Sequence, residues 1–348
     1  MAEDRDGGSD GRGPTDPRLS ALPIRSRADE ATGPRTGRQG RGMAPRQDIY
    51  LEHFGLTQRP FALLPDPEFL YWSEAHRGAH AMMDYGLMTR APITLITGEI
   101  GVGKTTLVQH FIASLGEDLT IGFIANAPPG TREILQWVLP ALGAEAPEGA
   151  SDVQLFHRFN AFLMAEHAAD RTVLLVVDEA QNLSRAALEE LRMLTNINAG
   201  KNELLQLLLV GQPELRRTVQ RPDMTQFAQR VAATFHIPAM DPSTVLGYIA
   251  HRLRVAGGTP DIFSRQAAEL VQAATGGVPR LVNQLCDLAL VYAFSAGLTR
   301  VRRATVQQVL DDGVFFAGGP RAQAAARGET APPQHANRPG ELKRGVAG

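Results

Sequence analysis

One stretch of the sequence combines glycines, a lysine and a threonine at spacings suited to phosphate chemistry. Gly98, Gly101 and Gly103 let the backbone turn with few Cβ clashes, so that successive N–H groups can face a phosphate. Lys104 brings a positive charge to the β- and γ-phosphate oxygens, and the Thr105 hydroxyl can enter the shell of a Mg²⁺ ion. This spacing is the G-x-x-x-x-G-K-[ST] phosphate loop. The nucleotide-binding residues expected from it are Gly98, Glu99, Ile100, Gly101, Val102, Gly103, Lys104, Thr105 and Thr106.

The elements around this loop are those that position a phosphate. A β-branched run, Ile93–Thr97, is typical of a buried parallel strand, and apolar periodicity predicts a helix from Thr106 towards Leu115. The loop therefore delivers its N–H groups at a helix N-terminus, where the helix dipole favours an anion. The alternative, a chance glycine loop with a lysine, does not explain why strand, loop and helix agree.

A second acidic site follows another apolar run. Thr172–Val177 predicts a strand, and Asp178 and Glu179 come directly after it. Ligands of open α/β sheets gather at the carboxyl ends of the strands. Asp178 is expected to hold Mg²⁺ through water, opposite Thr105, and Glu179 to orient and deprotonate an attacking water, which indicates hydrolysis. The competing interpretation is an acidic pair that caps the next loop.

Two further positions have side chains that could meet the nucleotide. Gln212 follows the strand predicted over 205–210 and could reach the attacking water or the γ-phosphate, unless it only forms the turn before Pro213. Arg280, after two glycines at the start of a predicted helix, is disfavoured there by the helix dipole. An anion such as the γ-phosphate would explain it better than a surface position would.

Two arginines, Arg221 and Arg230, precede the last predicted strand. In ring-forming ATPases an arginine at this place projects into the nucleotide of the neighbouring subunit and stabilises transition-state charge. Arg230 is the preferred candidate because it stands in an Arg-Val step just before the strand. A solvated surface role remains open for each of them.

Strands alternate with helices along the middle of the chain, which predicts a doubly wound parallel sheet of five strands. The predicted strands are 93–97, 119–125, 172–177, 205–210 and 234–237. The predicted helices between them are 106–115, 132–142, 152–167, 184–196 and 214–220, and Ser184 is a good N-cap for the fourth of them. A further helix over 75–88, capped by Ser73, precedes the first strand. After Pro238 only helices are predicted, over 242–255, 264–275, 278–294 and 304–313, which indicates a small four-helix domain packed against the α/β domain.

Composition sets the domain boundaries. Residues 1–47 and 317–348 are rich in Gly, Pro, Ala and Arg and are expected to be disordered tails. The α/β domain is placed at 48–240 and the four-helix domain at 241–316. The segment from Ile49 to Tyr71 is expected to be irregular and packed, with aromatic side chains that either fill a core or lie beside an adenine ring.

The overall composition excludes several classes of protein. The 348 residues carry a formal net charge of −2, so no strong electrostatic footprint for nucleic acid or membrane is present. The single cysteine, Cys286, cannot form an internal disulfide, which fits a reducing cytoplasm. No apolar run is long enough to span a bilayer, and the N-terminal stretch lacks the apolar segment of a secretory signal. We therefore expect a cytoplasmic protein, free or attached to the inner membrane through a partner.

A family resemblance is carried by five segments: HFGLTQRPFALLPDPEFLY, GEIGVGKTT, LLVVDEAQNLS, LLLVGQPEL and TGGVPRLVNQLCDLAL. Together they resemble AAA+ ATPases, and more narrowly the general-secretion-pathway protein A (ExeA-like) family, over residues 48–316. The resemblance implies an AAA+ core with a helical lid, ATP hydrolysis with Mg²⁺, and a homo-oligomeric ring or filament. It also implies that Gln212 is the first sensor and Arg280 the second. Secretion-type members continue into a membrane span and a peptidoglycan-binding module, and neither is expected here.

Three functions compete. The first is an ATPase that assembles or remodels a partner complex, in envelope secretion or polysaccharide export, through an unidentified protein client. The second is a DNA-binding accessory ATPase similar to the MuB/TniB transposition proteins, which would favour a basic groove that the net charge does not indicate. The third is a scaffold that binds ATP without hydrolysing it, and an intact Glu179 argues against it.

Overall fold

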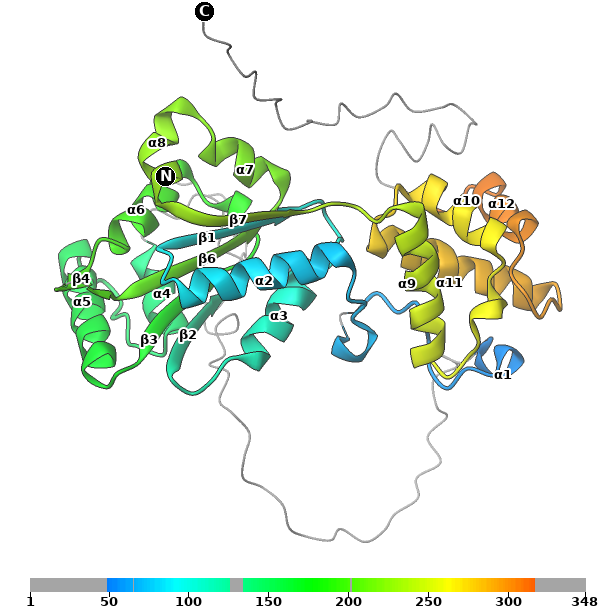
Figure 1. The fold of residues 1–348 in the computed structure, drawn as a ribbon, viewed down its shortest axis with the longest axis horizontal. Helices are drawn as coiled ribbons and strands as arrows, with labels where there is room; N and C mark the ends of the chain where they lie inside the picture. Colours follow the sequence, from blue (N-terminus) through cyan, green and yellow to red (C-terminus); the bar gives the residue numbers. More distant parts are fainter. Residues whose placement is uncertain (1–48, 65, 126–133, 201, 317–348) are drawn as a thin grey trace, which may run out of the picture. The chain divides into compact units, whose positions relative to one another are not determined.

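The computed structural model describes residues 49–64, 66–125, 134–200 and 202–316. These residues form two compact units, an α/β unit over 72–238 and a helical unit made of 49–71 together with 239–316 (Figure 1). The tails predicted over 1–47 and 317–348 lie outside the described residues. In the part of the chain that is described, no helix is both long and apolar enough to cross a membrane.

A five-stranded parallel sheet forms the centre of the α/β unit, in the order β2-β3-β6-β1-β7. Its strands are β1 (Ile93–Gly98), β2 (Leu119–Ile124), β3 (Thr172–Val177), β6 (Leu205–Gly211) and β7 (Val231–Ile237). The doubly wound parallel sheet predicted from the sequence is confirmed, and β3 has the predicted bounds. Strand β7 begins three residues earlier than predicted, because its first residues also pair with β1, across a register shift.

Both faces of the sheet are covered by helices, as its nearly continuous apolar strands require. One face packs on α2 (Glu74–Met88) and α3 (Lys104–Ser114), through a core that includes Met83, Phe111 and Val176. The other face packs on α4 (Leu135–Ala141), α5 (Asp152–Ala168) and α6 (Arg185–Leu194). The strand ends that carry the predicted site residues are thereby held by two separate hydrophobic layers.

The helix starts follow side-chain capping. Ser73 accepts a hydrogen bond from the backbone N–H of His76, and Ser184 accepts one from Ala187, so both predicted N-caps are confirmed. The helix predicted over 132–142 begins at Leu135 among the described residues, and the stretch 126–133 lies outside them.

Several short elements between β3 and β7 were not predicted. They are the 3₁₀ turn η3 (Ala180–Asn182) before α6, the hairpin of β4 (Asn198–Ala199) and β5 (Asn202–Glu203), the 3₁₀ turn η4 (Pro222–Met224) and the helix α8 (Thr225–Arg230). The predicted helix over 214–220 is present as α7 (Pro213–Val219). Helix α8 has six residues and buries only Phe227, so it leaves no periodic pattern to detect.

The helical unit contains the four helices expected after Pro238. They are α9 (Pro242–Val255), α10 (Arg265–Thr275), α11 (Pro279–Ser295) and α12 (Arg303–Asp311), and a 3₁₀ turn, η5 (Pro260–Ile262), precedes α10. Gly277 has a φ of 75°, and a Cβ on it would lie 1.9 Å from the carbonyl oxygen of Met240. Only glycine fits at this close approach, which ties the start of α11 to the segment before α9.

The segment 49–71 belongs to this helical unit, whereas the sequence placed it with the α/β domain. It contains α1 (Leu51–Phe54) and the 3₁₀ turn η2 (Pro67–Phe69). Its buried aromatic side chains belong to the same hydrophobic core as α9 to α12: Tyr50, Phe54, Phe61 and Phe69. This is the core-packing role that the sequence left open for them.

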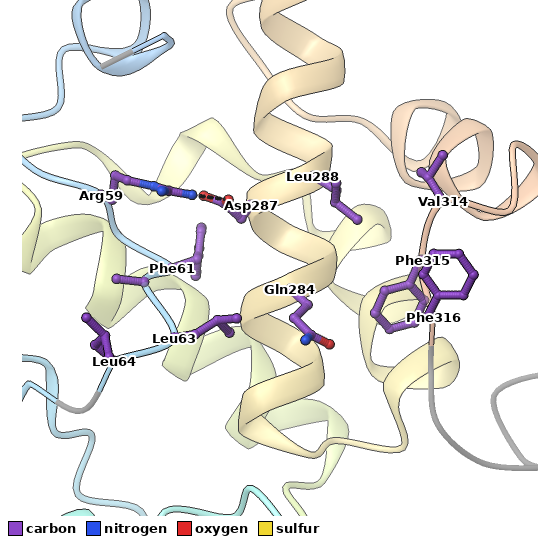
Figure 2. A pocket seen from close by; sticks show the side chains of 11 residues that line it. Arg59, Phe61, Leu63, Leu64, Gln284, Asp287, Leu288, Val314, Phe315 and Phe316 are labelled. Carbon is purple, nitrogen blue, oxygen red and sulfur yellow. Dashed lines mark hydrogen bonds and ion pairs between the residues drawn. The ribbon is translucent and has the colours of Figure 1, made fainter. Parts of the chain in front are cut away.

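A pocket of about 460 Å³ opens on the helical unit (Figure 2). Figure 2 shows the ion pair of Arg59 and Asp287 among the residues that line this pocket. The apolar side chains of Leu63, Leu64 and Phe316 line other parts of it. These residues come from segments far apart in the sequence, so only tertiary packing creates this pocket.

Candidate active site

The phosphate loop has the backbone shape that its glycines predict. Gly101 and Gly103 have φ values of 80° and 94°, in the left-handed region where a side chain would cause strain. A Cβ on Gly98 would lie only 2.8 Å from the carbonyl oxygen of Ile237 on the neighbouring strand β7. The loop thus connects β1 to α3, whose first residue is Lys104, and it offers the concave backbone that a phosphate needs.

Lys104 is nearly buried, with 5% of its surface exposed. Its Nζ donates hydrogen bonds to the carbonyl oxygens of Gly98 at 2.8 Å and Glu99 at 3.0 Å, which holds the ammonium over the loop. Burial lowers the pKa of Lys104, and the nearby negative charges of Glu179 and Asp178 oppose that shift. Contacts within the protein therefore hold a positive charge at the loop, ready to meet a phosphate.

Thr105 and Asp178 meet as predicted, although they are 73 positions apart. The Thr105 hydroxyl donates to Oδ2 of Asp178 at 2.6 Å, and Oδ1 accepts from the backbone N–H of Glu179 at 2.8 Å. Burial raises the pKa of Asp178, and the hydrogen bond from Thr105 opposes that shift.

This pair of oxygen donors suits Mg²⁺, which keeps most of its waters and takes one or two protein oxygens beside substrate phosphates. Among the described residues, no group of three or more His, Cys, Asp or Glu side chains could hold a metal ion by itself. The chemistry of the donor set therefore fits a Mg²⁺ ion that arrives with a nucleotide.

Glu179 is held in a restrained position at the end of β3. Its φ of 51° lies in the left-handed region, which is uncommon for a residue other than glycine and marks a backbone held by its surroundings. Its Oε2 accepts hydrogen bonds from the side-chain amides of Gln181 and, at 3.2 Å, of Gln212. The carboxylate predicted to act as the base and the predicted sensor are thus in direct contact.

Gln181 is a site residue that the sequence prediction missed. Besides binding Glu179, its Oε1 accepts the backbone N–H of Gln212 at 3.0 Å, so it bridges the ends of β3 and β6. A Cβ on Gly211 would lie 2.8 Å from this same oxygen. The glycine just before Gln212 is the signal that a neighbouring group approaches the backbone there.

The structure brings these residues to one edge of the sheet. The phosphate loop, the acidic pair and Gln212 follow β1, β3 and β6, which are neighbours in the order β3-β6-β1, and all three strands run parallel. Their carboxyl ends therefore form one surface, as expected for ligand sites of open α/β sheets. Thr106 lies in the first turn of α3, and Ile100 at the loop tip is 61% exposed.

Arg230 lies at the opposite edge of the same sheet. It is the last residue of α8, directly before β7, and β7 runs parallel to β1 with Val231 beside Ile93. Six residues of strand, at about 3.3 Å each, separate that edge from the phosphate loop, a distance of about 20 Å. The Arg230 side chain therefore cannot reach the phosphate loop of its own subunit.

Both candidate arginines have partners within the subunit. Arg230 donates to Glu203 Oε1 at 3.0 Å and also to the side chain of Asn196. Arg221 pairs with Asp223 on the surface, where its side chain is 53% exposed.

Arg280 belongs to the helical unit, where it is the second residue of α11 and is exposed. Its approach to a γ-phosphate, and its role as second sensor, stay predictions.

Comparison with known proteins agrees with this geometry. Residues 87–219 match the model of a family described as AAA domain. General secretion pathway protein A of Aeromonas hydrophila is 36% identical over 253 residues, which are 73% of this chain and 46% of that protein. The chain thus spans about half the length of this relative.

Two solved structures share the fold at low identity. The ORC2 protein of Aeropyrum pernix, in ADPNP–ADP complexes, matches with a TM-score of 0.50 and 18% identity over 68% of this chain and 66% of that chain. The ORC1 protein of the same organism, in complex with DNA, matches with a TM-score of 0.53 and 19% identity over 73% of this chain and 69% of that chain.

The parallel sheet, the phosphate loop on β1 and the acidic pair on β3 define an AAA+ P-loop NTPase fold, and the chain belongs to that class. Within it, the chain is a relative of general secretion pathway protein A.

Proposed function

We propose that this protein binds ATP with Mg²⁺ and hydrolyses it, and that the cycle assembles or remodels a partner complex. The observation that carries this proposal is the convergence of Lys104, Thr105, Asp178 and Glu179 at the carboxyl ends of β1 and β3, the two strands that flank β6. The ORC2 protein of Aeropyrum pernix, which shares the fold, was solved in ADPNP–ADP complexes, which supports a nucleotide as the ligand.

Each of these residues has a separate role in hydrolysis. The loop N–H groups and Lys104 bind the β- and γ-phosphates, and Thr105 with Asp178 would hold Mg²⁺, which neutralises phosphate charge when bound. Glu179 takes a proton from the attacking water while the oxygen of that water forms a bond to the γ-phosphorus. The bond from that phosphorus to the bridging oxygen breaks, which leaves ADP and phosphate. Gln212 and Gln181 orient the Glu179 carboxylate through the hydrogen bonds described above.

The biological role is proposed from the relative. General secretion pathway protein A is a secretion protein by name, and on that basis we assign this chain to envelope secretion or polysaccharide export. It would work in the cytoplasm or at the inner membrane through a partner, as a homo-oligomer acting on a protein client. Its ATPase activity should rise when that client is added to the purified protein.

A DNA-binding accessory role is the second candidate. It is favoured by the ORC1 protein of the same fold, which was solved in complex with DNA. Titrating duplex DNA into the ATPase assay distinguishes the two roles. A salt-sensitive rise in rate would support the DNA role, and an unchanged rate would support the protein client.

Lys104→Ala is expected to abolish nucleotide binding, because it removes the buried cation that faces the loop carbonyls. Isothermal titration with ATP and Mg²⁺ measures this directly. Arg217→Ala is the matched control, since it removes a positive charge from a side chain that is 72% exposed on α7. An affinity of the Lys104 variant within about threefold of wild type, roughly 0.7 kcal/mol, would overturn the assignment of the loop.

A further inference from the structure

A histidine outside the nucleotide motifs contacts the phosphate loop. His76 lies in the first turn of α2, and only 6% of its surface is exposed. Its Nε2 is 3.0 Å from the carbonyl oxygen of Val102, inside the loop. A Cβ on Gly103 would lie 3.3 Å from the same nitrogen, so the loop backbone packs directly against the imidazole.

The hydrogen bonds around His76 determine which nitrogen carries its proton. A carbonyl oxygen can only accept, so Nε2 must be the donor to Val102. Nδ1 is 2.7 Å from the hydroxyl of Ser73, whose oxygen already accepts the backbone N–H of His76 and whose own proton is free to point at Nδ1. Burial lowers the pKa of His76, which favours this neutral form.

This bond also orients a loop N–H group. The carbonyl of Val102 and the N–H of Gly103 belong to one planar trans peptide, so they point in opposite directions. Because His76 holds the carbonyl on its own side, the Gly103 N–H must point away from α2. Gly103 is also the N-cap of α3, where orphan N–H groups and the helix dipole favour an anion. Gly103 has no Cβ, so sterics alone do not fix the orientation of this peptide, and its φ of 94° is one that other residues rarely adopt.

We infer that His76 is a positioning residue for nucleotide binding, which holds the Val102–Gly103 peptide so that the Gly103 N–H faces the β-phosphate. This inference rests on the proposed function of the loop. It assigns to α2 a role beyond covering the sheet, and it connects the cap residue Ser73 to the loop through a single side chain.

Two substitutions at His76 test whether the hydrogen bond to Val102 is needed, or only a side chain that fills the space. His76→Gln places an amide N–H where Nε2 stands, so it can still donate to Val102. His76→Asn places its amide near the position of Nδ1, so it can meet Ser73 but falls short of the loop. His80→Asn is the matched control, because His80 lies one turn along α2 and its Nδ1 pairs with Asp84 instead.

The measurements are the ATP dissociation constant by isothermal titration, the rate at saturating ATP, and the melting temperature without nucleotide. We expect His76→Asn to weaken ATP binding about tenfold, the effect of losing one buried hydrogen bond, with the saturated rate within about threefold of wild type. His76→Gln and His80→Asn should bind within about threefold of wild type. Similar melting temperatures for the Gln and Asn variants would show that folding does not cause the difference.

Equal affinities of the Gln and Asn variants would overturn the positioning role, and so would a saturated rate that falls as much as the affinity. These failures are distinct from failure of the proposed function. If the proposed function is wrong, the wild-type protein itself does not bind ATP, or Lys104→Ala binds it as well as wild type does, whatever the His76 variants do.

Discussion

Arg230→Ala should bind ATP almost normally and hydrolyse it about 10³-fold more slowly, or worse, as expected when an arginine finger is lost. The reason is geometric. Arg230 stands before β7, at the sheet edge opposite the phosphate loop, so it can serve only the nucleotide of a neighbouring subunit. Steady-state hydrolysis and isothermal titration of the same preparation measure the two effects separately.

A mixing experiment tests the shared site. An Arg230→Ala subunit keeps its base and can accept the arginine of a Glu179→Gln neighbour, so mixing the two inactive proteins should restore some activity. Arg221→Ala is the matched control, because Arg221 is a surface arginine paired with Asp223. Normal hydrolysis by both arginine variants would contradict the shared-site model, as would an unchanged specific activity on dilution to a demonstrated monomer.

The intramolecular contacts of Arg230 add a requirement to this model. Its guanidinium is bound to Glu203 on β5 and to Asn196 after α6. To reach a neighbour's phosphate it must exchange these partners, and an ionised phosphate can replace the carboxylate of Glu203 as a charged, bidentate acceptor. The β4–β5 hairpin is therefore the element whose arrangement we expect to change when subunits assemble.

Glu179→Gln should lower the rate of hydrolysis by at least about a hundredfold, the usual range for loss of a general base, while ATP still binds. Glutamine keeps the shape of the side chain, but its amide cannot take the proton from water. Glu214→Gln is the matched control, because Glu214 is an exposed acid on α7 whose negative charge, like that of Glu179, raises the pKa of Lys104. Near wild-type turnover by the Glu179 variant would mean that this carboxylate is only structural.

Local sequence was sufficient for the elements whose signals lie in neighbouring residues. The phosphate loop, the strand Thr172–Val177 and the capping serines Ser73 and Ser184 were predicted and are present. Each depends on neighbouring residues alone: glycine spacing, a continuous apolar run, or a hydroxyl placed to bond the third residue of its helix. Short elements such as α8 were missed because six residues with one buried side chain carry no period.

Contacts between distant segments were decided only by the tertiary structure. The sequence indicates the nucleotide chemistry, because that chemistry needs particular residue types at fixed spacing. It does not indicate that His76 holds Val102, that Gln181 bridges Glu179 to Gln212, or that the segment 49–71 joins the helical unit. The packing of α2 brings His76 to the loop, the helical core takes up the segment 49–71, and strand order makes the ends of β3 and β6 neighbours. Arg230 is separated from the loop by the length of a strand, because β1 and β7 run parallel.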